Sequence, residues 1–219
     1  MPLQLPPVIL PLASLPDIEY FYWLFYSREA RIEIHETFPR QTCRNRYRIA
    51  TAGGTLTLSI PVVKPDGNHT QTSAIQIDQS KSWKQIHWRS IESAYNKSPF
   101  FLYYRDDFEA VLEIAPLSLM DFNLKIINLC CKLLKQSPDF KLSETFIKEP
   151  VGQFDMRHRI MPKQPITHQY SIMEFEPYTQ VFSDRQEFIP NLSMLDLLFN
   201  LGPDAGSYLR RLKEEISDF

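Results

Sequence analysis

Apolar and polar residues alternate along several segments of the first 80 residues, and this period of two predicts half-buried strands. Short strands are expected over residues 8–12 and 31–35. The stretch 44–63 alternates on both sides of Gly53 and Gly54. A pair of glycines between two alternating runs is typical of a hairpin loop, so a hairpin is expected here with these two residues at its tip.

The two faces of this hairpin differ in chemistry, because strand side chains point alternately to opposite sides. Arg44, Arg46 and Arg48 share one face and form a predicted basic stripe. The other face is apolar except for Asn45. With both glycines in the loop, the expected cross-strand pairs are Thr51 with Leu56, Ile49 with Leu58, and Tyr47 with Ile60.

Apolar residues recur at helical spacing in the rest of the chain. The first helix is expected over residues 14–27, with Ser14 as its N-cap, Pro16 in its first turn and Asp17 near the positive end of its dipole. Aromatic side chains surround this helix, which predicts burial on most faces. Further helices are expected over residues 82–97, 106–114, 119–133 and 193–201, and from Pro203 to about residue 217.

These elements together predict an α/β fold in a single domain over residues 1–219. A mixed β-sheet with a hairpin region in the N-terminal part is expected to be flanked by helices. Residues 138–190 are richer in proline and polar residues, so a loop-rich segment that wraps back onto the sheet is expected there. Residues 193–217 are expected to form the C-terminal helices.

Composition narrows the function class without naming a reaction. Lysine and arginine number 24 against 26 acidic residues, a net charge of −2, which argues against a general nucleic-acid binder. No uninterrupted run of 18 apolar residues occurs, so no membrane insertion is expected. The three cysteines have no metal-binding or redox spacing, and their odd number is typical of a reduced, cytoplasmic protein. Rossmann and Walker motifs, the usual phosphate-binding loops, are absent, and the sequence leaves any cofactor unknown.

The basic stripe is the first candidate binding site. Guanidinium groups bind phosphate or carboxylate with two hydrogen bonds and keep their charge at any relevant pH. Arg40 and Lys64 flank the same region. A small-molecule substrate that carries phosphate, such as a nucleotide-linked sugar or a CoA thioester, would supply the anion. The alternative is a solvated strand face, or arginines that pair with acidic side chains.

His87 is the candidate general base, because imidazole exchanges protons near neutral pH. It is expected on the buried face of its helix with Trp83 and Tyr95, which are candidate substrate contacts. The alternative for His87 is a hydrogen-bonded core residue. Asn45, on the apolar side of the hairpin, either positions a substrate or satisfies backbone groups nearby.

Polar residues before the 193–201 helix complete the predicted site. Tyr178, Gln180 and Asn191 lie in a segment that could close over a ligand, or could satisfy loop backbone instead. A cleft is therefore expected between residues 44–48, 83–95 and 178–193.

Two nucleophile hypotheses are weaker than these. Cys43 has basic neighbours, which lower a thiol pKa, but a structural role is favoured. Ser193 and Asp196 could form a triad with His87, yet a capping box explains both residues locally and no G-x-S-x-G motif surrounds the serine.

Several segments, in order along most of the chain, resemble the WbqC-like protein family. The matching pieces are Leu15-Pro-Asp-Ile-Glu-Tyr-Phe21, Phe38-Pro-Arg-Gln-Thr-Cys-Arg-Asn-Arg-Tyr-Arg-Ile49, Gly54, Ile60-Pro61-Val62, Trp83, His87, Tyr95, Pro99-Phe100, residues 119–123 and Asn191-Leu-Ser-Met-Leu-Asp-Leu-Leu-Phe-Asn-Leu-Gly202. The family takes its name from a bacterial gene product associated with O-antigen and other surface-polysaccharide loci. Many members carry His-Gln-Pro before the first of these segments, whereas this chain has Leu10-Pro11-Leu12.

The resemblance implies an enzyme of bacterial surface-polysaccharide biosynthesis, with group transfer to or from an activated or amino sugar as the expected reaction. The alternative is a non-catalytic ligand-binding or scaffold protein of the same pathway, and the absence of the His-Gln pair favours it. Nucleic-acid binding through the arginine stripe and Tyr47 is a third hypothesis, which the charge balance disfavours.

Overall fold

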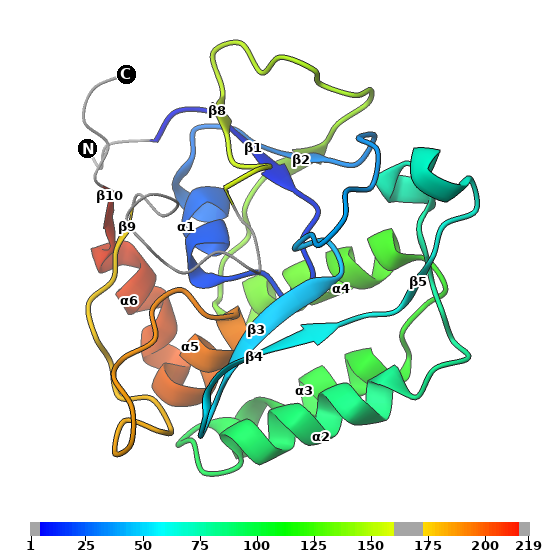
Figure 1. Ribbon diagram of the computed structural model, residues 1–219. Helices are drawn as coiled ribbons and strands as arrows, with labels where there is room; N and C mark the ends of the chain where they lie inside the picture. Colours follow the sequence, from blue (N-terminus) through cyan, green and yellow to red (C-terminus); the bar gives the residue numbers. More distant parts are fainter. Residues whose placement is uncertain (1–4, 160–172, 215–219) are drawn as a thin grey trace.

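The computed structural model describes residues 5–159 and 173–214, and a four-stranded parallel sheet lies in its upper part in Figure 1. Its strands, in the order β7-β2-β1-β8, are Phe140–Leu142, Ala30–Glu33, Val8–Pro11 and Phe154–Asp155. Every neighbouring pair is parallel. All residues of β1 are buried, because the sheet is covered on both sides. The α/β class and both strands expected in the first 35 residues are confirmed.

Helix α1 (Ile18–Tyr26) connects β1 to β2, and its N-cap is Asp17, which accepts a hydrogen bond from Tyr20 N at 3.0 Å. The expected start at Ser14 is therefore wrong by three residues. Ser14 Oγ lies 2.9 Å from the Arg44 carbonyl oxygen and 2.6 Å from Asn123 Oδ1, so it holds the preceding loop instead of capping the helix. Tyr20, Phe21, Tyr22 and Trp23 of α1 are buried as expected, whereas Phe25 and Tyr26 are partly buried. The Trp23 ring stacks on Phe154 at 4.7 Å.

The hairpin is confirmed with a corrected register. Strands β3 (Arg46–Thr51) and β4 (Gly54–Ser59) pair Tyr47 with Leu58 and Ile49 with Leu56, so the loop is Ala52-Gly53. The expected loop lay one residue too far along, which moves every pair by two residues. A shift of two keeps each side chain on its expected face.

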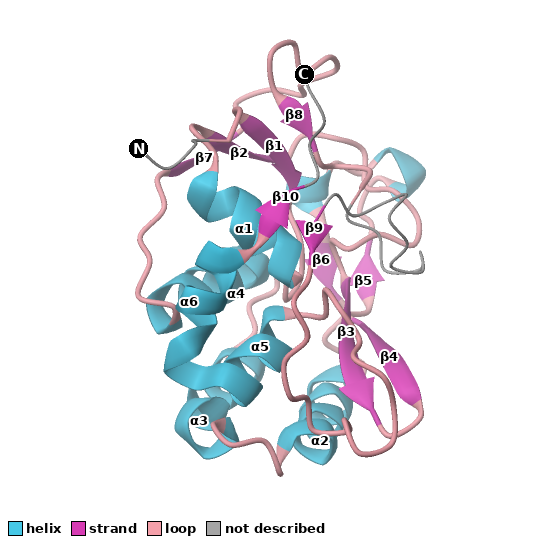
Figure 2. Ribbon diagram, turned by 90° about the vertical axis from the view of Figure 1, so that its left-hand side faces the viewer, coloured by secondary structure: helices cyan, strands magenta, loops and turns pink. Residues whose placement is uncertain are grey.

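Short elements follow the hairpin and lead into three helices. They are β5 (Val62–Val63), the 3₁₀ turns Gly67–His69 and Thr72–Ala74, and β6 (Gln76–Ile77). The helices are α2 (Trp83–Tyr95), α3 (Phe101–Glu113) and α4 (Leu119–Leu133). All three were expected, although α3 begins five residues before residue 106. Figure 2 shows most helices gathered on one side of the molecule and the hairpin on the other.

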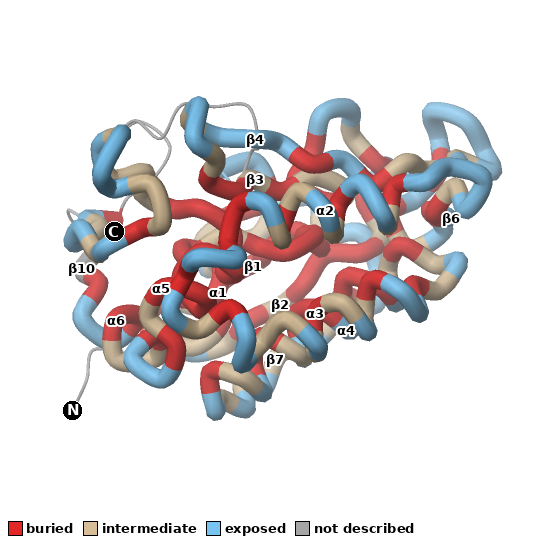
Figure 3. Tube along the Cα trace, turned by 90° about the horizontal axis from the view of Figure 1, so that it is seen from below, coloured by how far each residue is buried: buried red, intermediate tan, exposed pale blue. Residues whose placement is uncertain are grey.

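The C-terminal part contains β9 (Met173–Glu174), α5 (Met194–Leu201), the 3₁₀ turn Gly202–Asp204, α6 (Ala205–Arg211) and β10 (Lys213–Glu214). The last helix ends at Arg211, not near residue 217, because the chain turns extended at Leu212 and β10 then pairs with β9. Residues 215–217 of that expected helix lie outside the described residues. Buried residues concentrate along β1, β3, α1 and α5, while β4 is largely exposed (Figure 3). No described helix is long and apolar enough to cross a membrane.

Candidate functional site

A small pocket lies where the loop after β1 meets the start of the hairpin and the start of α5. Its walls come from Ala13, Ser14, Leu15, Pro16, Asp17, Cys43, Arg46, Tyr47, Arg48 and Ser193. The free volume of about 20 Å³ is room for about one water molecule. The pocket can therefore hold one end group of a larger ligand, and the carboxyl end of a parallel strand is where α/β proteins commonly bind ligands.

The loops that precede α1 and α5 pair with each other beside the pocket. Asp17 and Ser193 form an antiparallel bridge, Ile18 N donates to the Leu192 carbonyl at 3.1 Å, and Met194 N donates to the Pro16 carbonyl at 2.9 Å. Both helices thus begin at the pocket and direct the positive ends of their dipoles toward it. Their first amides are already engaged, so direct ligand contacts fall to the side chains.

Arg46 and Arg48 provide the positive charge of the pocket. They share one face of β3, as predicted, and both are partly buried. Arg46 Nε is buried and has no hydrogen-bond partner among the residues that the structure describes. Arg48 donates to the Asn191 carbonyl at 3.2 Å, and burial lowers its pKa from the ordinary value while leaving the guanidinium charged. Of the predicted binding residues, the structure brings Arg46, Arg48 and Asn191 together here.

Asp17 is the acidic group of the same pocket. Its surroundings remove most water from the carboxyl, and this desolvation raises the pKa of Asp17 to about 6, against the opposing effect of the Arg48 charge and the Tyr20 amide. A carboxyl with a pKa in this range can give or take a proton at physiological pH. The sequence interpretation placed Asp17 at a helix start and thereby missed its second role.

Backbone strain surrounds the pocket. Leu15, Gln41 and Asn191 adopt φ values of 38°, 52° and 50°, a left-handed region that residues other than glycine rarely occupy. Each lies in a different one of the three loops that meet here. Strain of this kind costs free energy and concentrates at functional sites. Its position independently marks the pocket as the candidate site.

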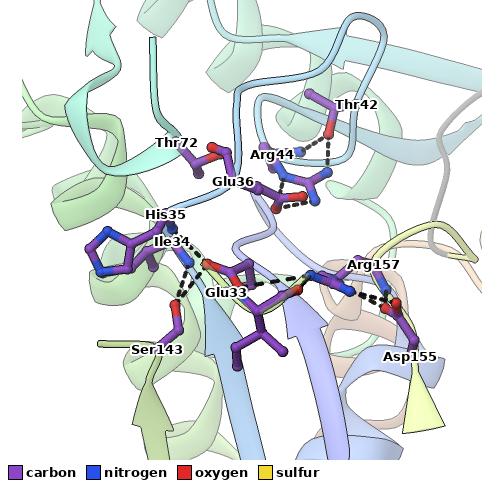
Figure 4. A network of polar contacts seen from close by, with 11 residues as sticks. Glu33, Ile34, His35, Glu36, Thr42, Arg44, Thr72, Ser143, Asp155 and Arg157 are labelled. Atoms are coloured by element: carbon purple, nitrogen blue, oxygen red, sulfur yellow. Dashed lines mark hydrogen bonds and ion pairs between the residues drawn. The ribbon is translucent and has the colours of Figure 1, made fainter. Parts of the chain in front are cut away.

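Arg44 does not belong to the basic stripe, which is a correction to the prediction. It precedes β3, is 1% exposed and makes a buried ion pair with Glu36, with Nε donating to Oε1 at 2.7 Å. Its Nη1 also donates to Thr42 (Figure 4). The sequence left open that arginines of the stripe pair with acidic side chains, and Arg44 does so.

A second buried network lies beside this ion pair at the carboxyl ends of the parallel strands (Figure 4). Glu33, at the end of β2, accepts from Ser143 Oγ at 2.8 Å, and Arg157 lies 3.8 Å from its other oxygen. Arg157 also pairs with Asp155 of β8 at 2.7 Å. The network connects β2, β7 and β8 across their ends, and each of its charges already has a partner.

His87 lies outside the pocket, in the core between α2 and the hairpin. It is 2% exposed; its Nε2 lies 3.2 Å from the Ser59 carbonyl, and its Nδ1 lies 2.9 Å from the Tyr47 hydroxyl. Because a carbonyl only accepts, Nε2 carries the proton and Nδ1 accepts from Tyr47. Burial lowers the pKa of His87 to about 4. Trp83 packs edge-on against it at 5.1 Å and is buried too.

Tyr95, Tyr178 and Gln180 come together around a different group, the buried carboxyl of Asp196. Tyr178 Oη donates to Asp196 at 2.6 Å, Gln180 Nε2 donates at 2.9 Å, and Tyr95 also contacts the carboxyl. Burial raises the pKa of Asp196. This cluster fastens the 178–180 segment to α5, and its residues are not part of the wall of the small pocket.

The remaining predicted residues have local roles. Asn45 Nδ2 donates to the Ile60 carbonyl at 2.8 Å, which is the backbone-satisfying alternative raised for it. Lys64 lies over the Phe38 ring at 5.1 Å, outside the pocket wall. Cys43 lines the pocket, but burial raises its pKa to about 11, so the thiolate is scarce. Ser193 caps α5 by accepting from Leu195 N at 3.4 Å, but the expected capping box is not formed, because Ser193 N donates to the Arg48 carbonyl and the Asp196 carboxyl accepts from Tyr178 and Gln180.

Comparison with known proteins gives one family. The WbqC-like protein family matches residues 13–163 and 144–208, which include every pocket residue. An uncharacterized protein of Mycobacterium tuberculosis (strain ATCC 25618 / H37Rv), Rv1507c, is 24% identical over 224 residues, which cover 91% of this chain and 95% of the relative. No solved structure gives a significant match.

Proposed function

We propose that this chain, which belongs to the WbqC-like protein family, is a group-transfer enzyme that acts on an activated or amino sugar in bacterial surface-polysaccharide biosynthesis. The observation that supports the proposal best is one small pocket shared by a carboxyl and two guanidinium groups. Arg46 and Arg48 would hold the phosphate of the activated substrate, and Asp17 would exchange the proton. The reduced state of the three buried cysteines fits a reaction in the cytoplasm.

The arrangement suits the departure of a phosphate leaving group. An acceptor hydroxyl or amine attacks the transferred group, and the bond from that group to the phosphate oxygen breaks with its electron pair on oxygen. The two guanidinium groups stabilise the charge that develops on the phosphate. Asp17, when protonated, gives its proton to that oxygen, and the acceptor releases its own proton to water. Asp17 takes this role in place of His87, whose ring nitrogens are both hydrogen-bonded within the core.

A thermal-shift screen against nucleotide-sugars, CoA thioesters and simple nucleotides tests the binding step. A ligand at 100 times its Kd stabilises the folded protein by about 2.7 kcal/mol, which is readily measured. The shift is expected with one ligand class and is expected to vanish in Arg46→Ala. Arg185→Ala is the matched control, because Arg185 is 67% exposed and remote from the pocket wall. A shift that survives in Arg46→Ala, or no shift with any class, contradicts the proposal.

A non-catalytic ligand-binding or scaffold role is the second candidate. Leu10, Pro11 and Leu12, which stand where many family members carry His-Gln-Pro, are all buried in the core. No side chain of these three can perform acid–base chemistry at the end of β1. This candidate predicts saturable ligand binding with no turnover when the screened donor is combined with sugar and amino-sugar acceptors.

A further inference from the structure

Asp17 faces Arg46 and Arg48 across the pocket without forming an ion pair with either in the described part of the chain. Its Oδ1 accepts from Tyr20 N at 3.0 Å, which leaves Oδ2 for a ligand. The arginines keep free capacity as well, because Arg46 Nε has no partner and Arg48 makes one long bond to a carbonyl. The two guanidinium groups and the second carboxyl oxygen of Asp17 therefore lie around one small space and can each form further hydrogen bonds there.

We infer that a tetrahedral dianion, such as a terminal phosphate, binds at the open mouth of this pocket with one oxygen inside it, together with one proton, which resides on Asp17. The inference rests on the proposed function and specifies its substrate end group. An ionised carboxylate repels an anion placed beside it, whereas a carboxylic acid donates a hydrogen bond to it. With Asp17 protonated, the two guanidinium charges match the two charges of the dianion. The protonated Asp17 is also the state that the transfer step requires.

The other titratable groups near Asp17 are neutral or already hold a hydrogen bond. The thiol of Cys43 and the hydroxyl of Tyr20 are buried and already neutral, since burial raises the pKa of each. The remaining ones are Glu19, held by Asn191 Nδ2 at 3.2 Å, and Tyr47, whose hydroxyl binds His87. Asp17 is the carboxyl in the pocket wall, and its pKa of about 6 places its change of charge in the range from pH 5.5 to 8.

Sulfate is the appropriate probe, because it has the shape and charge of a phosphate dianion and does not titrate in this range. Calorimetry in two buffers of different ionisation enthalpy measures the protons taken up on binding. The wild type is expected to take up close to one proton per sulfate at pH 7. Its Kd is expected to fall up to ~tenfold for each pH unit from 8 to 6. Methyl sulfate, a monoanion of the same shape, is expected to bind more weakly.

Asp17→Asn and Asp17→Ser both retain a helix-capping side chain, so each is expected to fold. Both are expected to bind sulfate with no proton uptake and little pH dependence, while Asp204→Asn, at an exposed cap, behaves as the wild type. The inference is overturned if the wild type binds sulfate independently of pH or does not bind it. Proton uptake that persists in both Asp17 variants also overturns it. The thermal-shift screen distinguishes this outcome from failure of the proposed function, in which no ligand class stabilises the protein or the stabilisation survives in Arg46→Ala.

Discussion

At the scale of single residues, His87 shows how one buried side chain serves stability. The unfolded chain binds a proton at its ordinary pKa of 6.5, whereas the folded protein does so at about 4. Stability is therefore lost as the pH falls from 6.5 toward 4, by about 3 kcal/mol in total. At pH 7 we expect His87→Ala to lower the free energy of unfolding by about 2–4 kcal/mol, because it leaves a cavity and an unpaired Tyr47 hydroxyl.

Denaturant unfolding at pH 7 and pH 4.5 measures both effects of His87. The difference in stability between wild type and His87→Ala is expected to shrink at the lower pH. His69→Ala is the control, because His69 is exposed and a change there is expected to cost less than about 0.5 kcal/mol. A stable His87→Ala protein that has lost only activity would restore the general-base hypothesis.

Asp17 behaves in the opposite sense, because its pKa is raised on folding. Ionisation of Asp17 in the folded state is unfavourable and lowers the free energy of unfolding. This loss of stability is absent below about pH 4 and complete above about pH 6. Asparagine caps a helix as well as aspartate does but carries no charge. We expect Asp17→Asn to gain about 2–3 kcal/mol of stability relative to wild type between pH 4 and pH 7. Parallel unfolding curves at those two pH values measure it, and a constant difference would contradict the raised pKa.

At the scale of elements, the local pattern of residues predicted most of the secondary structure. The α2 face that carries Trp83 and His87 is buried as its helical spacing requires. The hairpin register was wrong by two residues, because Gly53 and Gly54 look alike in sequence while Gly54 alone adopts a left-handed φ, of 107°. Strands β7 and β8, with three and two residues, are too short for a period-two pattern.

The end of α5 depends on Gly202. Its φ is 53°, and a Cβ built there would lie 2.5 Å from the Phe100 ring. Since both the backbone and the ring resist a side chain, we expect Gly202→Ala to cost about 2–4 kcal/mol of unfolding free energy. Gly206→Ala is the matched control, because its Cβ would meet nothing closer than 3.6 Å and alanine favours helix α6. Thermal melts that rank the two variants in the reverse order would contradict this assignment.

At the scale of the whole molecule, the candidate site is made by contacts that no local pattern encodes. Asp17 and Ser193 lie far apart in the chain and meet through backbone pairing of two loops. The arginine stripe was predicted from alternation, and two of its members line the pocket. The third, Arg44, points into the core, because it pairs there with Glu36. Glu36 lies in a loop whose course depends on the tertiary fold, so its position could not be predicted from local pattern.

The Glu36–Arg44 pair therefore connects the core to the pocket. The Arg44 carbonyl accepts from Asn123 Nδ2 at 2.8 Å and lies beside Ser14, which lines the pocket, while the Glu36 carbonyl accepts from Thr72 N at 2.9 Å. Removing either partner leaves the other as an uncompensated buried charge. We expect Glu36→Gln and Arg44→Met each to lower the free energy of unfolding by about 3–5 kcal/mol.

The double variant Glu36→Gln/Arg44→Met distinguishes the interaction between the two charges from the effect of each substitution by itself. Because neither buried charge then remains, its loss of stability is expected to be smaller than the sum of the single losses by at least about 2 kcal/mol. Chemical denaturation of the four proteins closes the cycle. The exposed pair Asp184–Arg185 is the matched comparison, where coupling below about 1 kcal/mol is expected. Additive losses at Glu36 and Arg44 would show that their buried charges act independently and would contradict a stabilising ion pair.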